Sequence, residues 1–135
     1  MSMDTVRILR DHGIAPSAQR VAVATFVLHT DTHPSADEVW HRVRERLPQV
    51  SRATVYNTLN LFVERGLLRS MALTEGRMVF DPKIEPHHHF IDEETGHIHD
   101  VPWEALPVPR SLEVRGYDVR EFQVVMRGRR RPPER

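Results

Sequence analysis

A run of three histidines, His87, His88 and His89, lies near the middle of the chain, and His97 and His99 follow it closely. Five of the nine histidines therefore fall between residues 85 and 104, a stretch that contains no Lys or Arg. Neutral imidazole and carboxylate together are a ligand set for a borderline divalent metal. This density of histidine and acid predicts a metal or haem site, and the alternative is a polar loop whose histidines are merely solvated.

Composition restricts what kind of protein this is. A length of 135 residues suits one ordinary domain or two small ones. The absence of Cys excludes disulfides, thiolate zinc sites and iron–sulfur clusters. Zero net charge means that nucleic-acid binding would depend on local patches. No apolar run can span a bilayer, and the start at residues 1–4 lacks a signal-peptide pattern, so a cytoplasmic protein without a membrane partner is expected.

The first 80 residues read as helices followed by a hairpin. Ser17, Ser35 and Ser51 are placed as helix N-caps, and Glu38 completes a capping box with Ser35. Gly66 suits the left-handed position after the last helix. The expected helices span residues 5–12, 17–30, 35–47 and 51–65, and the expected strands span 67–73 and 77–80. Helices followed by a two-stranded ribbon are typical of a winged helix-turn-helix. The outer face of its fourth helix is either a DNA-reading surface or an ordinary solvated one.

The second half changes character after a stretch with two prolines at 81–86. Its pattern predicts strands at 88–92, 97–101 and 117–126, and a short helix at 110–115. A three-stranded unit of this size buries too little surface to be stable alone. We therefore expect a homodimer formed through residues 85–127.

These residues together resemble the ferric uptake regulator family of metal-dependent bacterial transcription factors. The resemblance covers nearly the whole chain, and its most specific block is Ala53-Thr54-Val55-Tyr56. Other matching stretches are residues 16–20, 33–39, 51–59 and 66–68. The second half shows the family's acid after the wing, its His-x-His pair and a further acid, here Asp81, His87 with His89, and Asp100.

The resemblance implies an α+β fold with an N-terminal winged helix-turn-helix and a small α/β dimerisation domain. The implied parts are a DNA-binding domain at 1–80, a hinge at 81–86, a dimerisation and metal-sensing domain at 87–127, and a basic disordered tail at 128–135. It also implies one regulatory divalent metal per subunit, bound at the domain junction, which sets the geometry in which the dimer meets an operator. The implied ligands are His33, Asp81, His87, His89 and Asp100. Fe²⁺ or Mn²⁺ suits these ligands in the cell, and Zn²⁺ would bind in vitro.

The chain lacks the residues that bind additional metal ions in other members of the family. The two Cys-x-x-Cys pairs of a structural zinc are missing, the first of them falling at Asp92 and Thr95, so no structural zinc held by four cysteines is expected. A histidine expected near Phe122 for an accessory metal is also missing. The dimer core is therefore expected to hold by packing alone.

Two subgroups of the family remain open. The missing Cys, the triple His and the ending at residues 124–127 look most like the iron response regulators, which sense haem or iron, so His87, His88 and His89 are candidate haem ligands. The peroxide-stress regulators share the same three-His, two-Asp site. In them Fe²⁺ reacts with peroxide and a ligand histidine is oxidised, here His33 or His87.

For DNA, the expected contacts are Tyr56 and Arg52, assisted by Thr54 and Asn57. Arg20 matches a family residue that supports either backbone contact or helix packing. Whether the metal-bound or the metal-free form binds DNA is not readable from the sequence. An alternative class is a His/Asp metalloenzyme with a glutamate as general base. The chain shows no His-Glu-x-x-His motif, nucleophile motif or phosphate-binding glycine loop, so no enzyme and no small-molecule substrate is expected. A metal or haem carrier would leave the polar helix face unexplained.

Overall fold

The chain forms two compact units, Met1–Ile84 and Glu85–Arg135. The computed structural model describes residues 3–74, 76–109 and 111–133. Within those residues, no helix is long and apolar enough to cross a membrane.

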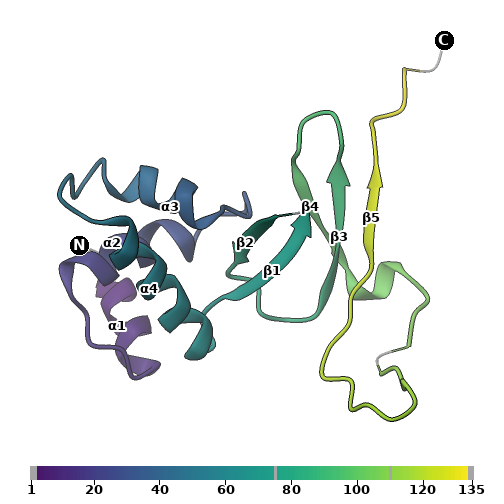
Figure 1. The fold of residues 1–135 in the computed structure, drawn as a ribbon, viewed down its shortest axis with the longest axis horizontal. Coiled ribbons are helices and arrows are strands. Elements are labelled where there is room, and N and C mark those ends of the chain that lie inside the picture. Colours follow the sequence, from purple (N-terminus) through teal and green to yellow (C-terminus); the bar gives the residue numbers. More distant parts are fainter. Residues whose placement is uncertain (1–2, 75, 110, 134–135) are drawn as a thin grey trace. The chain divides into compact units, whose positions relative to one another are not determined.

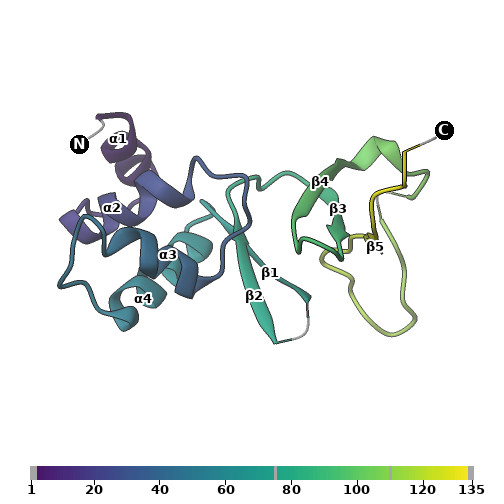
Figure 2. The same cartoon turned by 90° about the horizontal axis from the view of Figure 1, so that it is seen from above.

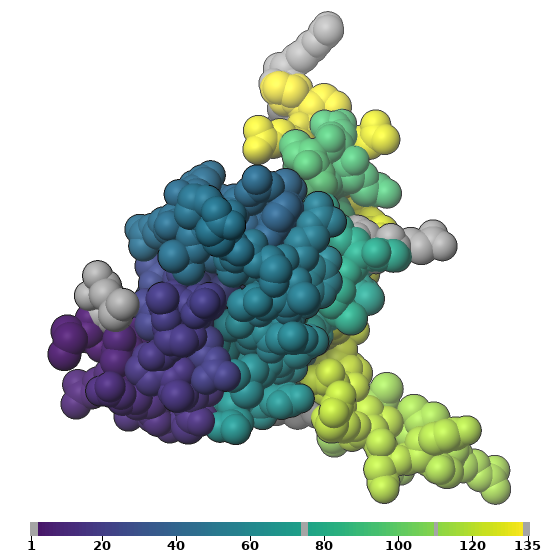
Figure 3. All heavy atoms as spheres, turned by 60° about the vertical axis from the view of Figure 1, so that its left-hand side comes forward, coloured from purple at the N-terminus to yellow at the C-terminus, as the bar shows by residue number. Residues whose placement is uncertain are grey.

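The first unit is a helical bundle followed by a hairpin (Figure 1). Its elements are α1 (Met3–Asp11), α2 (Ala18–Val27), α3 (Ala36–Val43), α4 (Arg52–Glu64), β1 (Arg69–Thr74) and β2 (Arg77–Asp81), and the two strands pair antiparallel. Each helix contributes fully buried apolar side chains to one core, among them Leu9, Val23, Val39, Leu59 and Phe62. Figure 3 shows the outer surface of these packed helices in purple and blue. This is the winged helix-turn-helix arrangement that the sequence predicts.

Serine caps begin three of the helices as predicted. The side chains of Ser17, Ser35 and Ser51 each accept a hydrogen bond from the backbone N–H three residues on. Ser35 Oγ also donates to Glu38 Oε1 at 3.2 Å, so the two residues of the predicted capping box contact each other through their side chains. Gly66 follows α4 with a φ of 79°, the left-handed conformation expected of it.

Among the boundaries in this unit that differ from the prediction are the ends of α3 and of β2. The third helix ends at Val43 rather than at Pro48. Beyond Val43 only isolated turns follow, such as the one closed by the Leu47 N–H to Val43 O bond, and Leu47 is only half-buried. The last strand extends to Asp81, one residue beyond the expected end. Asp81 is therefore held by the sheet instead of beginning a linker.

The second unit is a three-stranded mixed sheet with its central strand supplied by the triple histidine (Figure 2). Its elements are β3 (His87–Asp92), β4 (Ile98–Pro102), a 3₁₀ turn (Trp103–Ala105) and β5 (Val125–Gly128). The strand order is β4-β3-β5, with β4 antiparallel and β5 parallel to β3. In this register His89 lies opposite Asp100 on one side and Val125 on the other.

Two predictions for the segment before β5 are wrong. No helix forms over residues 111–116, and residue 110 lies outside the described residues. A helix this short needs a packed face, and Leu112 and Val114 are both exposed, so nothing offsets the cost of nucleation. The expected strand at 117–126 begins only at Val125. Hydrogen bonding between this segment and β3 starts with the bond from the His89 N–H to Val124 O, so the residues before it do not pair as a strand.

The contribution of a serine N-cap to stability can be tested at α4. Replacing Ser51 with Ala removes the acceptor for the Thr54 N–H and should lower the free energy of unfolding by about 1 kcal/mol. Urea unfolding followed by circular dichroism measures the change. Ser70→Ala, at an exposed position of β1, is the matched control and should change little. Equal losses in the two variants would contradict a specific capping role.

Candidate functional site

In the first unit, His33 and Asp81 form a buried pair. His33 Nε2 lies 3.2 Å from Asp81 Oδ2, and both residues are 3% exposed. The Phe80 N–H donates to Pro34 O at 2.9 Å, so the backbone beside His33 is fastened to β2 next to Asp81. His33 has a φ of 51°, a left-handed conformation that is uncommon outside glycine and is concentrated at functional sites.

The other oxygen of Asp81 has a different partner. The Lys83 N–H donates to Asp81 Oδ1 at 2.9 Å, which orients the carboxylate so that Oδ2 faces the imidazole. The first unit therefore presents one imidazole nitrogen and one carboxylate oxygen side by side.

In the second unit, His87 and His89 project to the same side of β3, and Asp100 reaches them from β4. Asp100 Oδ1 lies 3.3 Å from His87 Nε2 and 3.4 Å from His89 Nε2. The two rings meet edge to face at 4.5 Å, and both residues are almost completely buried. The alternation along the strand that placed these two residues on one side is confirmed. The result is three convergent donors, two nitrogens and one oxygen.

Hydrogen bonds on the far side of each ring favour a ligand role. His87 Nδ1 lies 2.7 Å from Glu85 O, and His89 Nδ1 lies 2.6 Å from Gln123 Oε1. Both partners are acceptors, so each imidazole carries a proton on Nδ1, and its Nε2 faces Asp100. A lone pair and a carboxylate oxygen repel each other unless a cation or a proton lies between them. Neutral imidazoles oriented in this way are the form that binds a metal ion.

His88 differs from its two neighbours. Its ring stacks on Trp103 with centroids 4.3 Å apart and is fully buried. The Val124 N–H donates to His88 Nδ1 at 2.9 Å, so the proton sits on Nε2, and Nε2 has no hydrogen-bond partner among the described residues. Burial lowers the pKa of His88, and His87 and His89 lower it further. The three consecutive histidines therefore do not form one ligand set.

The remaining two histidines of the cluster lie on the surface. His97 and His99 are exposed, and their rings contact each other at 4.3 Å. Neither belongs to the His33–Asp81 pair of the first unit or to the group of His87, His89 and Asp100 in the second.

The polar face of α4 carries the residues predicted to contact DNA. Arg52, Tyr56 and Asn57 are exposed, and Thr54 is half-buried. A hollow of about 230 Å³ is lined by Thr54 and Asn57 together with Arg20, whose guanidinium also donates to Ala15 O at 2.9 Å. The structure thus places Arg20 beside α4.

The residues that hold the Arg52 side chain in place were not predicted from the sequence. The guanidiniums of Arg44 and Arg52 each lie over the Trp40 ring, 4.5 Å from its centroid. Asp37 also contacts the face, since its Oδ1 lies 3.7 Å from Arg52 Nη1 and accepts from the Tyr56 hydroxyl at 3.4 Å. The spacing of Trp40 and Arg44, four residues apart at the end of α3, could have revealed half of this arrangement.

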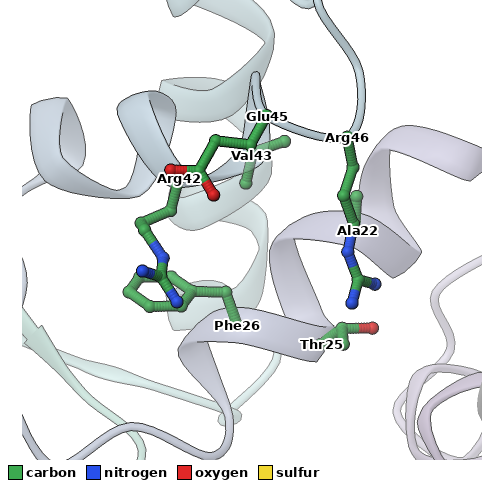
Figure 4. Close-up of a pocket in the computed structure, with 7 residues that line it drawn as sticks. All are labelled: Ala22, Thr25, Phe26, Arg42, Val43, Glu45 and Arg46. Carbon is green, nitrogen blue, oxygen red and sulfur yellow. The ribbon is translucent and has the colours of Figure 1, made fainter.

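A second hollow lies between α2 and α3 (Figure 4). It measures about 230 Å³, with Arg42 over the Phe26 ring and Arg46 extending toward Thr25. Its single carboxylate is Glu45, and it contains none of the residues predicted for metal or DNA.

Comparison with known proteins gives consistent matches. The model of the ferric uptake regulator family matches residues 11–127. The peroxide-responsive repressor PerR of Staphylococcus saprophyticus is 32% identical over 109 residues, which cover 81% of this chain and 74% of the repressor.

Solved structures support the same fold. The ferric uptake regulator from Pseudomonas aeruginosa, solved with manganese, superposes with a TM-score of 0.69 at 23% identity, covering 96% of this chain and 100% of that one. The peroxide stress regulator of Campylobacter jejuni gives a TM-score of 0.63 at 22% identity and covers 98% of each chain. The expected α+β architecture is confirmed. With a family match over most of its length and a relative at 32% identity, the chain belongs to the ferric uptake regulator family.

Proposed function

We propose that this chain binds operator DNA as a homodimer and responds to one divalent metal held by both of its units. The proposed ligands are His33, Asp81, His87, His89 and Asp100. As a member of its family the chain is a metal-dependent DNA-binding regulator. The observation that carries the finer proposal is that each unit presents buried imidazole donors facing a carboxylate, Asp81 in the first unit and the partly exposed Asp100 in the second.

The donor set determines which metals fit. Three imidazole nitrogens and two carboxylate oxygens, without any thiolate, suit Fe²⁺ or Mn²⁺, and Zn²⁺ would bind as well or better in vitro. Haem is outside this proposal, because His88 is fully buried against Trp103 and its Nδ1 accepts the Val124 N–H.

The regulatory step follows from sharing ligands between the units. The first unit offers two donors and the second offers three, so the full set of five ligands, and the binding free energy that goes with it, requires both units. Metal occupancy would therefore restrict how the DNA-reading helix is held relative to the dimerisation sheet. We propose that this restriction sets the spacing between the two α4 helices of a dimer.

Substitution of single ligands tests the shared site. His33→Ala and His89→Ala should each weaken Mn²⁺ binding by about 100-fold or more, because even outer-shell partners of metal ligands typically contribute about 10–100-fold. Competition against a fluorescent chelator measures the affinity. His97→Ala removes an exposed histidine outside the group and should leave binding unchanged. Unchanged affinity in His33→Ala would show that the first unit supplies no ligand.

The DNA-reading role rests on the α4 surface. A guanidinium held flat by Trp40 is ready for the paired hydrogen bonds that Arg makes with guanine. Asp37 holds Arg52 and Tyr56 on the same side of the helix in the absence of DNA. Arg20, Thr54 and Asn57 are proposed to contact phosphates and base edges beside them.

Arg52→Ala and Tyr56→Ala should weaken binding to specific DNA more than to a scrambled duplex. The expected loss of discrimination is about 1–3 kcal/mol for each base contact removed. Gel shifts with the DNA upstream of the chain's own gene, against a scrambled version of it, measure both affinities. Arg7→Ala on the exposed face of α1 is the control and should affect the two duplexes equally. Equal losses in Arg52→Ala would argue against base reading.

Peroxide sensing is the second candidate, favoured by the names of the relatives. Several curated relatives at 28–32% identity are peroxide-responsive repressors. In this reading an imidazole beside bound Fe²⁺ takes up one oxygen atom from peroxide, and the altered ligand no longer holds the metal. The proposed targets are His33 and His87.

Mass spectrometry after peroxide treatment separates the two functions. For a peroxide sensor, Fe²⁺-loaded protein should gain one oxygen atom on the peptide containing His33 or His87 and should lose its DNA, whereas Mn²⁺-loaded protein should do neither. If the Fe²⁺ form keeps both peptides unmodified while DNA binding still follows the metal concentration, the chain is a metal sensor without peroxide chemistry.

A further inference from the structure

We propose that Gln123 is a positioning residue for the metal centre. Its side-chain oxygen holds His89 in the tautomer and orientation that present Nε2 to the metal. This inference rests on the proposed function, because His89 is one of the proposed ligands.

The geometry at His89 supports this role. Gln123 Oε1 lies 2.6 Å from His89 Nδ1, and the His89 ring is fully buried. An amide oxygen can only accept, so the ring proton is placed on Nδ1. The lone pair then sits on Nε2, on the opposite side of the ring, where Asp100 Oδ1 lies 3.4 Å away. Without an acceptor at Nδ1, the ring could place its proton on Nε2 instead, and that nitrogen could not bind metal.

Neighbouring residues hold Gln123 in place. We call Phe122–Val124 the anchoring segment. The Phe122 ring meets Trp103 edge-on at 5.2 Å. Val124 accepts from the His89 N–H at 3.1 Å and donates to His88 Nδ1 at 2.9 Å. Gln123 is thus fixed on both sides, and its side chain loses little further freedom when it bonds His89.

The anchoring segment also distinguishes two adjacent histidines. It offers His89 an acceptor, which puts the proton on Nδ1, and it offers His88 a donor, which puts the proton on Nε2. His89 is thereby prepared as a ligand, and His88 becomes a packing residue against Trp103. By contrast, the Nδ1 partner of His87 is the backbone oxygen of Glu85, which any sequence would supply. His89 is the ligand of β3 whose orientation depends on a side chain, and substitution can therefore tune it.

Three variants separate the hydrogen bond from packing. Gln123→Leu keeps the side-chain size but cannot accept, and should weaken Mn²⁺ binding about 10–100-fold. Gln123→Glu can only accept at neutral pH, and should bind Mn²⁺ as tightly as the original or more tightly. Phe122→Leu loosens the anchoring segment but keeps the acceptor, and should weaken Mn²⁺ binding less than Gln123→Leu does. Chelator competition on the full-length protein measures all of these.

A second readout follows the ring itself. Nitrogen NMR of the metal-free protein should show a proton on His89 Nδ1 in the original and in Gln123→Glu, whether or not Nε2 also carries one toward Asp100. In Gln123→Leu, part of the population should carry its proton on Nε2 alone. An unchanged tautomer and unchanged affinity in Gln123→Leu would overturn the proposal. Equal losses in Phe122→Leu and Gln123→Leu, or in Gln123→Glu and Gln123→Leu, would overturn it as well, because the acceptor would then not be the cause.

His89→Ala in the same titration keeps the two proposals apart. If His89→Ala retains full affinity, His89 is not a ligand and the proposed metal site fails along with this inference. If His89→Ala loses affinity while Gln123→Leu does not, the metal site stands and only the positioning role of Gln123 is wrong.

Discussion

The constraint on which the rest of the structure depends is the burial of imidazole and carboxylate donors facing one another. Asp81 is almost completely removed from water, with His33 Nε2 3.2 Å from its carboxylate, and Asp100 approaches two imidazole nitrogens at 3.3–3.4 Å. Burying a carboxylate is costly unless a partner or a cation compensates it. Each unit therefore carries polar groups that gain from a shared positive charge. A metal ion is the partner that their geometry and chemistry suit.

The two faces of strand β3 have different roles, one in the proposed metal site and one in packing. His87 and His89 point to the donor side, whereas His88 packs on Trp103 in the interior of the unit. Because the chain has no Cys, no thiolate zinc holds this sheet together. The ring contact between Trp103 and Phe122 of the anchoring segment holds the sheet instead. The same contacts that stabilise the sheet also determine which ring nitrogen carries a proton. The contacts that pack the sheet and the proposed metal ligands therefore share a small set of residues.

The proposed DNA-reading face of α4 follows a similar principle, with a half-buried residue orienting an exposed one. Trp40 donates its indole N–H to Val50 O at 3.1 Å, and its fixed ring then supports two guanidiniums. An Arg that is already flat and oriented loses less conformational entropy when it meets DNA than a freely rotating one. Asp37 contributes an opposing charge that DNA phosphates would have to displace. The face is thus preorganised before any partner arrives.

The sequence by itself determined what depends on short-range order. Serine caps, the glycine after α4 and the alternation of His87 with His89 follow from neighbouring residues, and the resemblance to the family supplied the expected ligands. Only the tertiary structure decided what depends on distant burial. The helix expected at 110–115 does not form over residues 111–115, because its apolar side chains are exposed and pack against nothing. The last strand begins only where its backbone can form hydrogen bonds with β3. The tertiary structure also joined Gln123 to His89, 34 residues apart, and placed Arg52 over Trp40 from a different helix. No periodicity encodes such pairs, because they arise where separate elements pack against each other.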